Sequence, residues 1–161
     1  MRIGIQALGV IGLDPGQEIS PGFEAVAEAG FECVDFSLEA FYDTRSVSDT
    51  SIPCFYDKSP DELKSFFEPY LKACAKCGLT FSQMHGPFMR YIADEYGRAH
   101  FLEIEKKAIE IAGFMGSSYI VLHPVIADSE ADVVRELQIN RDFFSIYDIS
   151  LRFIHHYIHI F

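Results

Sequence analysis

Two histidines stand in equivalent surroundings, and their chemistry is that of a ligand-binding or metal-binding site. His85 follows the apolar start of the stretch 80–88 (TFSQMHGPF), and His123 follows that of 119–125 (YIVLHPV). The Gly-Pro and Pro that come next end regular structure, so each imidazole is predicted at the C-terminal tip of a strand. Neutral imidazole binds Zn, Mn or Co and also hydrogen-bonds hydroxyl groups. In one parallel sheet both rings would meet at the edge where α/β proteins bind ligands.

Two more polar residues are expected near the same edge. Asp35 lies near the end of the stretch 31–36 (FECVDF), and Gln6 lies near the tip of the first apolar stretch. At the end of a strand, the Asp35 carboxylate can accept a hydrogen bond from a loop N–H. Gln83, two residues before His85, should share its side of the strand and in a barrel would line the interior.

The elements that must position these residues alternate between strand and helix. Strands are predicted at 2–8, 31–36, 79–85 and 119–123, and helices at 23–29, 59–78, 98–115 and 133–144. The second helix has the clearest start, because Ser59 and Glu62 form a capping box around Pro60. The same helix contains Pro69, where a kink or break is expected.

Four strand–helix repeats with long crossovers predict a parallel α/β sheet. No GxGxxG or GxxxxGK[ST] motif follows any predicted strand, so a nucleotide-binding open sheet has no support. A complete (β/α)₈ barrel needs about 250 residues, whereas this chain has 161. The predicted fold is therefore a partial TIM barrel, a half-barrel of about four βα repeats.

Charge and composition narrow the possible partners. The net charge is -11, with 24 acidic against 13 basic residues, so a nucleic-acid partner is not favoured. A signal peptide and an apolar run of about 18 residues are both missing, so we expect a cytoplasmic protein with no membrane partner. The Cys74–Cys77 CxxC pair lies within a predicted helix without a second pair, and we interpret these cysteines as structural or incidental.

The composition changes at residue 143. Residues 143–161 (FFSIYDISLRFIHHYIHIF) contain no Gly, Ala, Pro, Glu or Lys. We expect residues 1–142 to form the half-barrel and 143–161 to be an atypical tail, out-of-frame or substitute sequence after a truncation. A natural strand or helix is the alternative. The tail histidines, His155, His156 and His159, could bind metal adventitiously if the tail is genuine.

Three blocks resemble the xylose isomerase-like TIM-barrel superfamily, and sugar phosphate isomerases/epimerases in particular. They are GFECVDF at 30–36, SQMHGPF at 82–88 and KAIEIAGFMGSSYIVLHP at 107–124, and the resemblance extends to about residue 142. The histidine pair also resembles endonuclease IV, a more distant branch. The resemblance implies a divalent-metal enzyme, with Mn, Zn, Co or Mg, that moves a proton or hydride between adjacent sugar carbons. It also implies that most metal ligands lie on later strands, which this chain lacks.

Site assignments follow from the histidine pair and this resemblance together. His85 and His123 are the expected metal ligands, with Asp35, Gln6 and His85 as substrate contacts and no catalytic residue assigned. Three functions stay open. They are a sugar or sugar phosphate isomerase/epimerase, an endonuclease IV-like phosphodiesterase, and a non-catalytic half-barrel that forms a homodimer through its open strand edges.

Overall fold

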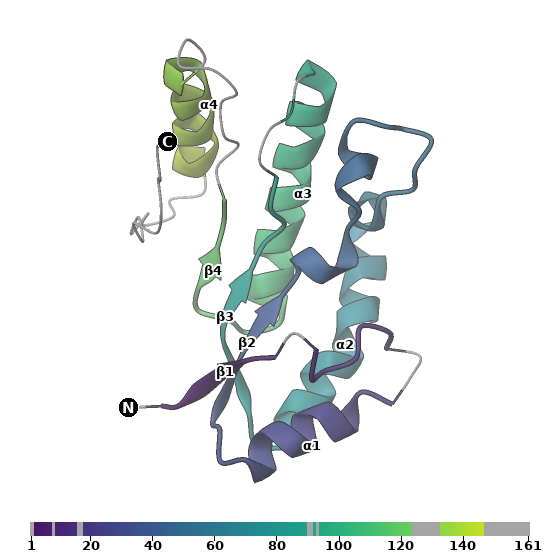
Figure 1. Cartoon of the computed structure of the whole chain (residues 1–161), viewed down its shortest axis with the longest axis vertical. Coiled ribbons are helices and arrows are strands. Elements are labelled where there is room, and N and C mark those ends of the chain that lie inside the picture. Colours follow the sequence, from purple (N-terminus) through teal and green to yellow (C-terminus); the bar gives the residue numbers. More distant parts are fainter. Residues whose placement is uncertain are drawn as a thin grey trace.

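Strands and helices alternate through the chain, as Figure 1 shows. The computed structural model describes residues 2–7, 9–15, 18–89, 92, 94–123 and 133–146. The elements in order are β1 (Gly4–Gln6), α1 (Ser20–Glu28), β2 (Cys33–Ser37), α2 (Pro60–Lys76), β3 (Thr80–His85), α3 (Glu95–Phe114), β4 (Ile120–Val121) and α4 (Val133–Ile146). Three 3₁₀ turns lie between β2 and α2: η1 (Glu39–Phe41), η2 (Thr44–Val47) and η3 (Phe55–Asp57). The predicted strand–helix alternation is confirmed.

All described strands belong to one parallel sheet in the order β1-β2-β3-β4. Neighbours in the sequence are therefore neighbours in the sheet. Because the strands are parallel, their carboxyl ends share one edge, and loops that follow them lie near one another. The predicted α/β class with four parallel βα units is confirmed.

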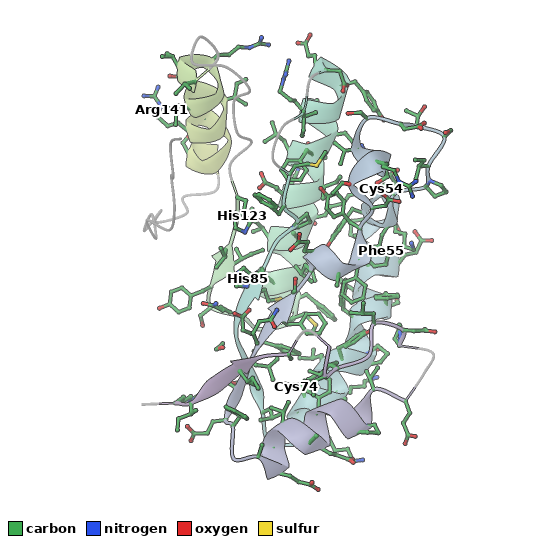
Figure 2. All side chains as sticks on the ribbon, viewed as in Figure 1. Cys54, Phe55, Cys74, His85, His123 and Arg141 are labelled. Atoms are coloured by element: carbon green, nitrogen blue, oxygen red, sulfur yellow. The ribbon has the colours of Figure 1, made fainter. Side chains whose placement is uncertain are left out.

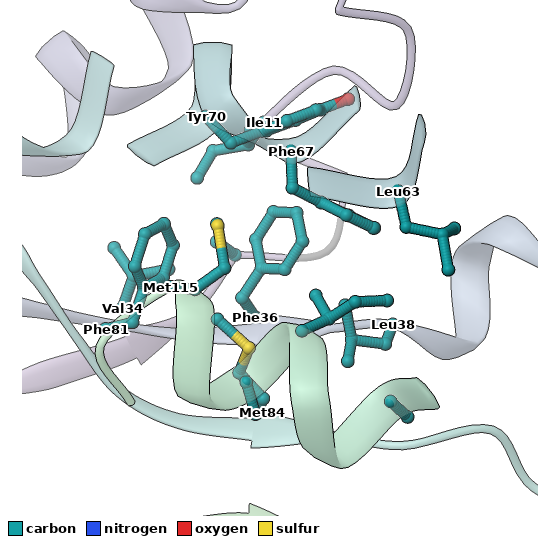
Figure 3. Packing of buried hydrophobic residues seen from close by; sticks show 14 of the residues in the cluster. Ile11, Val34, Phe36, Leu38, Leu63, Phe67, Tyr70, Phe81, Met84 and Met115 are labelled. Atoms are coloured by element: carbon teal, nitrogen blue, oxygen red, sulfur yellow. The ribbon is translucent and has the colours of Figure 1, made fainter. Parts of the chain in front are cut away.

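The core lies between the sheet and the helices and is rich in aromatic rings. The Phe36 ring contacts Phe81 at 5.6 Å and Tyr70 at 5.4 Å between centroids, both in edge-on geometry. Figure 3 shows Phe36 among residues from the strands and from α2. Edge-on aromatic pairs add stabilisation beyond burial of their area. This packing fixes the strands that carry the predicted site.

A β-bulge in β3 decides which side chains face the core. Val34 pairs with Phe81 but Asp35 pairs with Gln83, so Ser82 is an extra residue on β3. Side chains alternate along a strand, and the extra residue shifts that alternation by one position. Phe81 and Met84 are consequently both buried in the core although they are three residues apart. Gln83 and His85 thus share the opposite face of the sheet.

Three helix predictions need correction. α1 begins at Ser20, three residues before the predicted start, because Pro21 lies inside its first turn and not ahead of it. α2 begins as predicted, with the capping box of Ser59 and Glu62 in place, but no break occurs, because the helix runs through Pro69 to Lys76. A kink at Pro69 stays a prediction. Buried Phe67 and Tyr70 anchor the helix on either side of the proline, so packing outweighs its lost N–H. α3 begins three residues earlier than predicted, because the Asp94 side chain accepts a hydrogen bond from the Gly97 N–H at 2.6 Å.

The C-terminal predictions are tested only in part. Helical backbone continues across residue 142 to Ile146, the end of α4. Residues 147–161, with the three tail histidines, lie outside the described part, and so do the acidic residues at 128–132. The origin of the tail therefore stays a prediction. No helix in the described part of the chain has the length and apolar character needed to cross a membrane.

Candidate functional site

The structure brings the two predicted histidines together. His85 is the last residue of β3, and His123 follows β4 by two residues. Their ring centroids are 6.4 Å apart, with 23° between the ring planes, and Figure 2 shows both beside β3 and β4. The sheet pairing continues past His85, because the Gly86 N–H donates to the Val121 carbonyl at 2.9 Å. Adjacent parallel strands therefore hold the two imidazoles side by side.

Asp35 lies within the same face and holds His85. Its Oδ1 is 2.9 Å from His85 Nδ1, and its Oδ2 accepts a hydrogen bond of 2.7 Å from Gln83 Nε2. An ionised carboxylate only accepts, so Nδ1 carries the proton in this contact. The proton on Nδ1 leaves Nε2 of a neutral ring with a lone pair for a metal or a hydroxyl hydrogen. Asp35 thus acts on the site through the orientation of His85.

His123 is shaped by its burial and its neighbours. The Phe88 ring stands edge-on to the imidazole, with centroids 4.9 Å apart. Burial lowers the pKa of His123, nearby His85 lowers it further, and Glu39 acts in the opposite direction. His123 is therefore neutral at pH 7. Neutral imidazole is the form that binds metal or accepts a hydrogen bond.

Gln6 lies in the same row of the sheet as Asp35. Gln6 is the register partner of Asp35 across β1 and β2, and Asp35 is in turn the partner of Gln83. Register partners in a parallel sheet have side chains on the same face. The sheet therefore aligns all the predicted site residues on one side, with Gln6 exposed at its outer end.

The donor set fits a metal only in part. A catalytic metal site normally takes three protein ligands, and His85 and His123 supply two imidazoles. Within the described residues, the group of three close metal-type ligand atoms lies elsewhere, at Cys54, Asp57 and His100. The histidine face accordingly offers a partial set of nitrogen ligands, one of them oriented by a carboxylate.

The sequence patterns missed some residues that shape this region. The Tyr42 hydroxyl donates to the Phe88 carbonyl at 3.1 Å and so holds the segment after β3. Burial raises the pKa of Tyr42 well above its ordinary value, so the phenol keeps its proton. Nothing in the polar loop around Tyr42 marked it for this contact. The bulge, by contrast, could have been predicted, because two large apolar residues three positions apart, Phe81 and Met84, can both face the core only if the strand holds one extra residue.

Comparison with known proteins finds similarity in structure. No family model and no curated protein matches the sequence. A sugar phosphate isomerase/epimerase from Parabacteroides distasonis ATCC 8503 matches with a TM-score of 0.50 and 20% identity, over 86% of this chain and 44% of that one. A xylose isomerase-like TIM barrel/4-hydroxyphenylpyruvate dioxygenase fusion protein matches with a TM-score of 0.45 and 16% identity, over 90% and 20%.

This chain thus spans less than half the length of either matching structure. At 20% identity the first match shows the fold, which is the α/β arrangement of a TIM barrel. The fold resemblance expected from the sequence is confirmed at that level.

Proposed function

We propose that the face formed by Asp35, His85 and His123 binds a sugar or sugar phosphate in a protein of the isomerase/epimerase type. One observation carries the proposal: Asp35 orients His85 at 2.9 Å, and His123 lies beside it with ring centroids 6.4 Å apart. The structural likeness to a sugar phosphate isomerase/epimerase supports the same class of substrate.

The proposed chemistry is proton transfer next to a sugar carbonyl. Asp35 keeps the proton on His85 Nδ1, and Gln83 keeps Asp35 in place by occupying its second oxygen. Burial keeps His123 neutral, so it can accept a hydrogen bond from a sugar hydroxyl. A divalent metal (Mn, Zn, Co or Mg) held by His85 and His123 would stabilise negative charge on the substrate oxygen.

Full activity needs more than these residues. Two imidazoles are fewer than the three ligands of a usual catalytic site, so further ligands and the acid/base group must come from outside the described face. The solved isomerase/epimerase chain is longer, since this chain covers 44% of it. We accordingly expect metal and sugar binding to be weak in this chain by itself.

Metal titration tests the proposal. Calorimetry with Mn²⁺ should show binding to the parent protein, loss of that binding in H85A and H123A, and a roughly tenfold to hundredfold weaker affinity in D35N. Asp61→Asn is the matched control for D35N, because it removes an exposed carboxylate at the start of α2, outside both groups of metal-type ligands, and should leave Mn²⁺ affinity unchanged. Equal affinities in the parent, H85A and H123A would overturn the proposal.

A second candidate function is a half-barrel that pairs with another copy of itself. Large apolar side chains are exposed beside both outer strands: Ile3 next to β1 is 57% exposed and Tyr119 next to β4 is 71% exposed. Open strand edges with apolar flanks favour association. Light scattering coupled to size-exclusion chromatography should show a dimer that becomes a monomer in an I3K/Y119K variant. A monomeric parent rejects this candidate.

A further inference from the structure

A second set of metal-type ligands lies between the loop after β2 and helix α3. Cys54 directly precedes η3, Asp57 ends η3, and His100 lies on the second turn of α3. Their Sγ, carboxylate oxygen and ring nitrogen all lie within 4.8 Å of one another. In Figure 2, Cys54 lies well apart from His85 and His123. This group is therefore separate from the face described above.

His100 is held in a way that calls for a positive charge. Its Nδ1 is 3.0 Å from the Val47 carbonyl oxygen, and its Nε2 is 2.8 Å from Asp57 Oδ1. A carbonyl only accepts, so Nδ1 carries a proton, and a neutral ring would then turn its Nε2 lone pair toward a carboxylate oxygen. Two lone pairs at that separation repel each other. A cation bound between Nε2 and Asp57 Oδ1 would be attracted to both.

The backbone around η3 is fixed before any ligand binds. The buried Tyr56 hydroxyl donates to the Leu38 carbonyl at 2.7 Å. Lys107, two turns beyond His100 on α3, donates to the Tyr56 carbonyl at 2.6 Å and to the Lys58 carbonyl at 3.1 Å. Asp57 lies between these two carbonyls and Cys54 lies two residues before Tyr56, so both are held near α3. Preorganised ligands lower the cost of binding an ion.

We propose that Cys54, Asp57 and His100 bind a Zn²⁺-class cation. Thiolate and imidazole ligands select zinc over Mg²⁺ or Ca²⁺, which prefer all-oxygen sites. Zinc distances of ~2.0–2.3 Å place tetrahedral ligand atoms roughly 3.3–3.6 Å apart, so shifts of about 1 Å would close the site. The Val47 carbonyl provides the outer hydrogen bond that metal-bound histidines usually make.

Burial gives the site an inner and an outer side. The Cys54 residue is 6% exposed and the Asp57 side chain is 61% exposed. The ion can therefore enter beside Asp57 and keep a water molecule as its fourth ligand. The bound ion would join η3 to α3 and stabilise the folded chain by mass action.

Co²⁺ absorption spectroscopy on the reduced, full-length protein tests the site. Co²⁺ should produce a thiolate-to-metal charge-transfer band that Zn²⁺ removes. The band should disappear in C54S and persist in C77S, the matched cysteine control, and in the H85A/H123A double variant. D57N, which changes an exposed side chain, should retain the fold by circular dichroism and bind Co²⁺ at least roughly tenfold more weakly.

Two results would overturn this site. One is the absence of a charge-transfer band in the parent protein. The other is a band that is lost in C77S and kept in C54S, which would place the ion at the helical cysteine pair. Because H85A/H123A keeps this site intact, failure here and failure of the proposed sugar-binding face are separate outcomes.

Discussion

The chain contains two histidine–carboxylate pairs with nearly equal contact distances and opposite burial. At the face formed by Asp35, His85 and His123, the His85 side chain is 32% exposed and the Asp35 side chain is 16% exposed, and the two are 2.9 Å apart. At η3, His100 is 14% exposed and Asp57 is 61% exposed across 2.8 Å. In the first pair the carboxylate of Asp35 is the more buried group and the ring of His85 is the more exposed one. In the second pair the ring is inner and the acid is presented outward.

The comparison shows that a third group, which hydrogen-bonds to one member of each histidine–carboxylate pair, decides what the pair can bind. Gln83 also donates to Asp35, and within the described part of the chain the second ring nitrogen of His85 has no hydrogen-bond partner. His100 is also held by the Val47 carbonyl, so both of its ring nitrogens face acceptors. The same two residue types thus favour a free imidazole ligand in one place and a cation between ring and acid in the other.

Glu105 provides the reference case, because no described histidine hydrogen-bonds to this buried carboxylate. It is fully buried, and within the described part of the chain neither of its oxygens has a hydrogen-bond partner. Burial raises its pKa from 4.5 to about 8. The folded state therefore keeps a proton that the unfolded state releases. Its contribution to stability is fully present below pH 4.5 and is lost progressively up to about pH 8.

We expect the largest effect at Glu105. Urea unfolding between pH 5 and 8 should show the contribution of this group falling by on the order of 1.4 kcal/mol per pH unit. Glu105→Gln should remove that slope, because the amide does not ionise. Glu103→Gln is the matched control, since Glu103 is an exposed partner of Lys106 on the same helix and should leave the slope unchanged. An unchanged slope in E105Q contradicts the prediction.

The next effect compares the two acids directly. Asp35→Ala removes the acceptor of two hydrogen bonds and should lower the free energy of unfolding by about 1–3 kcal/mol. Asp57→Ala removes an exposed acid and, in the presence of a chelator, should cost less than about 1 kcal/mol. Urea titrations of both variants measure the difference. Equal losses would mean that burial does not distinguish the two pairs.

The smallest effect concerns His123, whose ring lies beside that of His85. Removing Phe88 should expose His123 and raise its pKa toward the ordinary value, because burial is the main cause of the lowering. His85→Ala should raise the same pKa by less. NMR titration of the imidazole signals measures both shifts. A larger shift in H85A than in F88A would make charge, and not burial, the leading cause.

The lowered pKa of His123 also sets a sign for stability. The unfolded state binds a proton more readily than the folded state, so this contribution is present above the ordinary pKa of 6.5 and is lost as the pH falls below it. Glu105 acts in the opposite direction over its own range. F88A should therefore reduce the loss of stability at acid pH, whereas E105Q should reduce the loss of stability as the pH rises.

The strand–helix alternation could be predicted from the sequence because each helix start and each strand is marked by residues close together in the chain. Ser59 and Glu62 mark a helix start within four residues, and the apolar runs before His85 and His123 mark strands directly. The meeting of the two histidines then followed from parallel pairing alone. The early start of α3 at Asp94 was missed because the apolar stripe, which begins later, was given more weight than the cap.

Residues whose partners are distant in sequence could not be predicted in the same way. Asp35 contacts Gln83 and His85 about 50 positions away, and His100 contacts Asp57 across 43 positions. No periodicity specifies such pairs. Glu105 did carry a local signal that was overlooked, since it stands four residues after Phe101 on the buried stripe of α3.

The bulge at Ser82 decides which side chains β3 presents to the face opposite the core. If Ser82 were paired regularly, Gln83 would oppose Phe36 and Met84 would oppose Ser37, so Met84 would turn away from the core and the imidazole of His85 would turn into it. An engineer who transfers this strand to another scaffold must therefore either preserve the bulged pairing or delete Ser82.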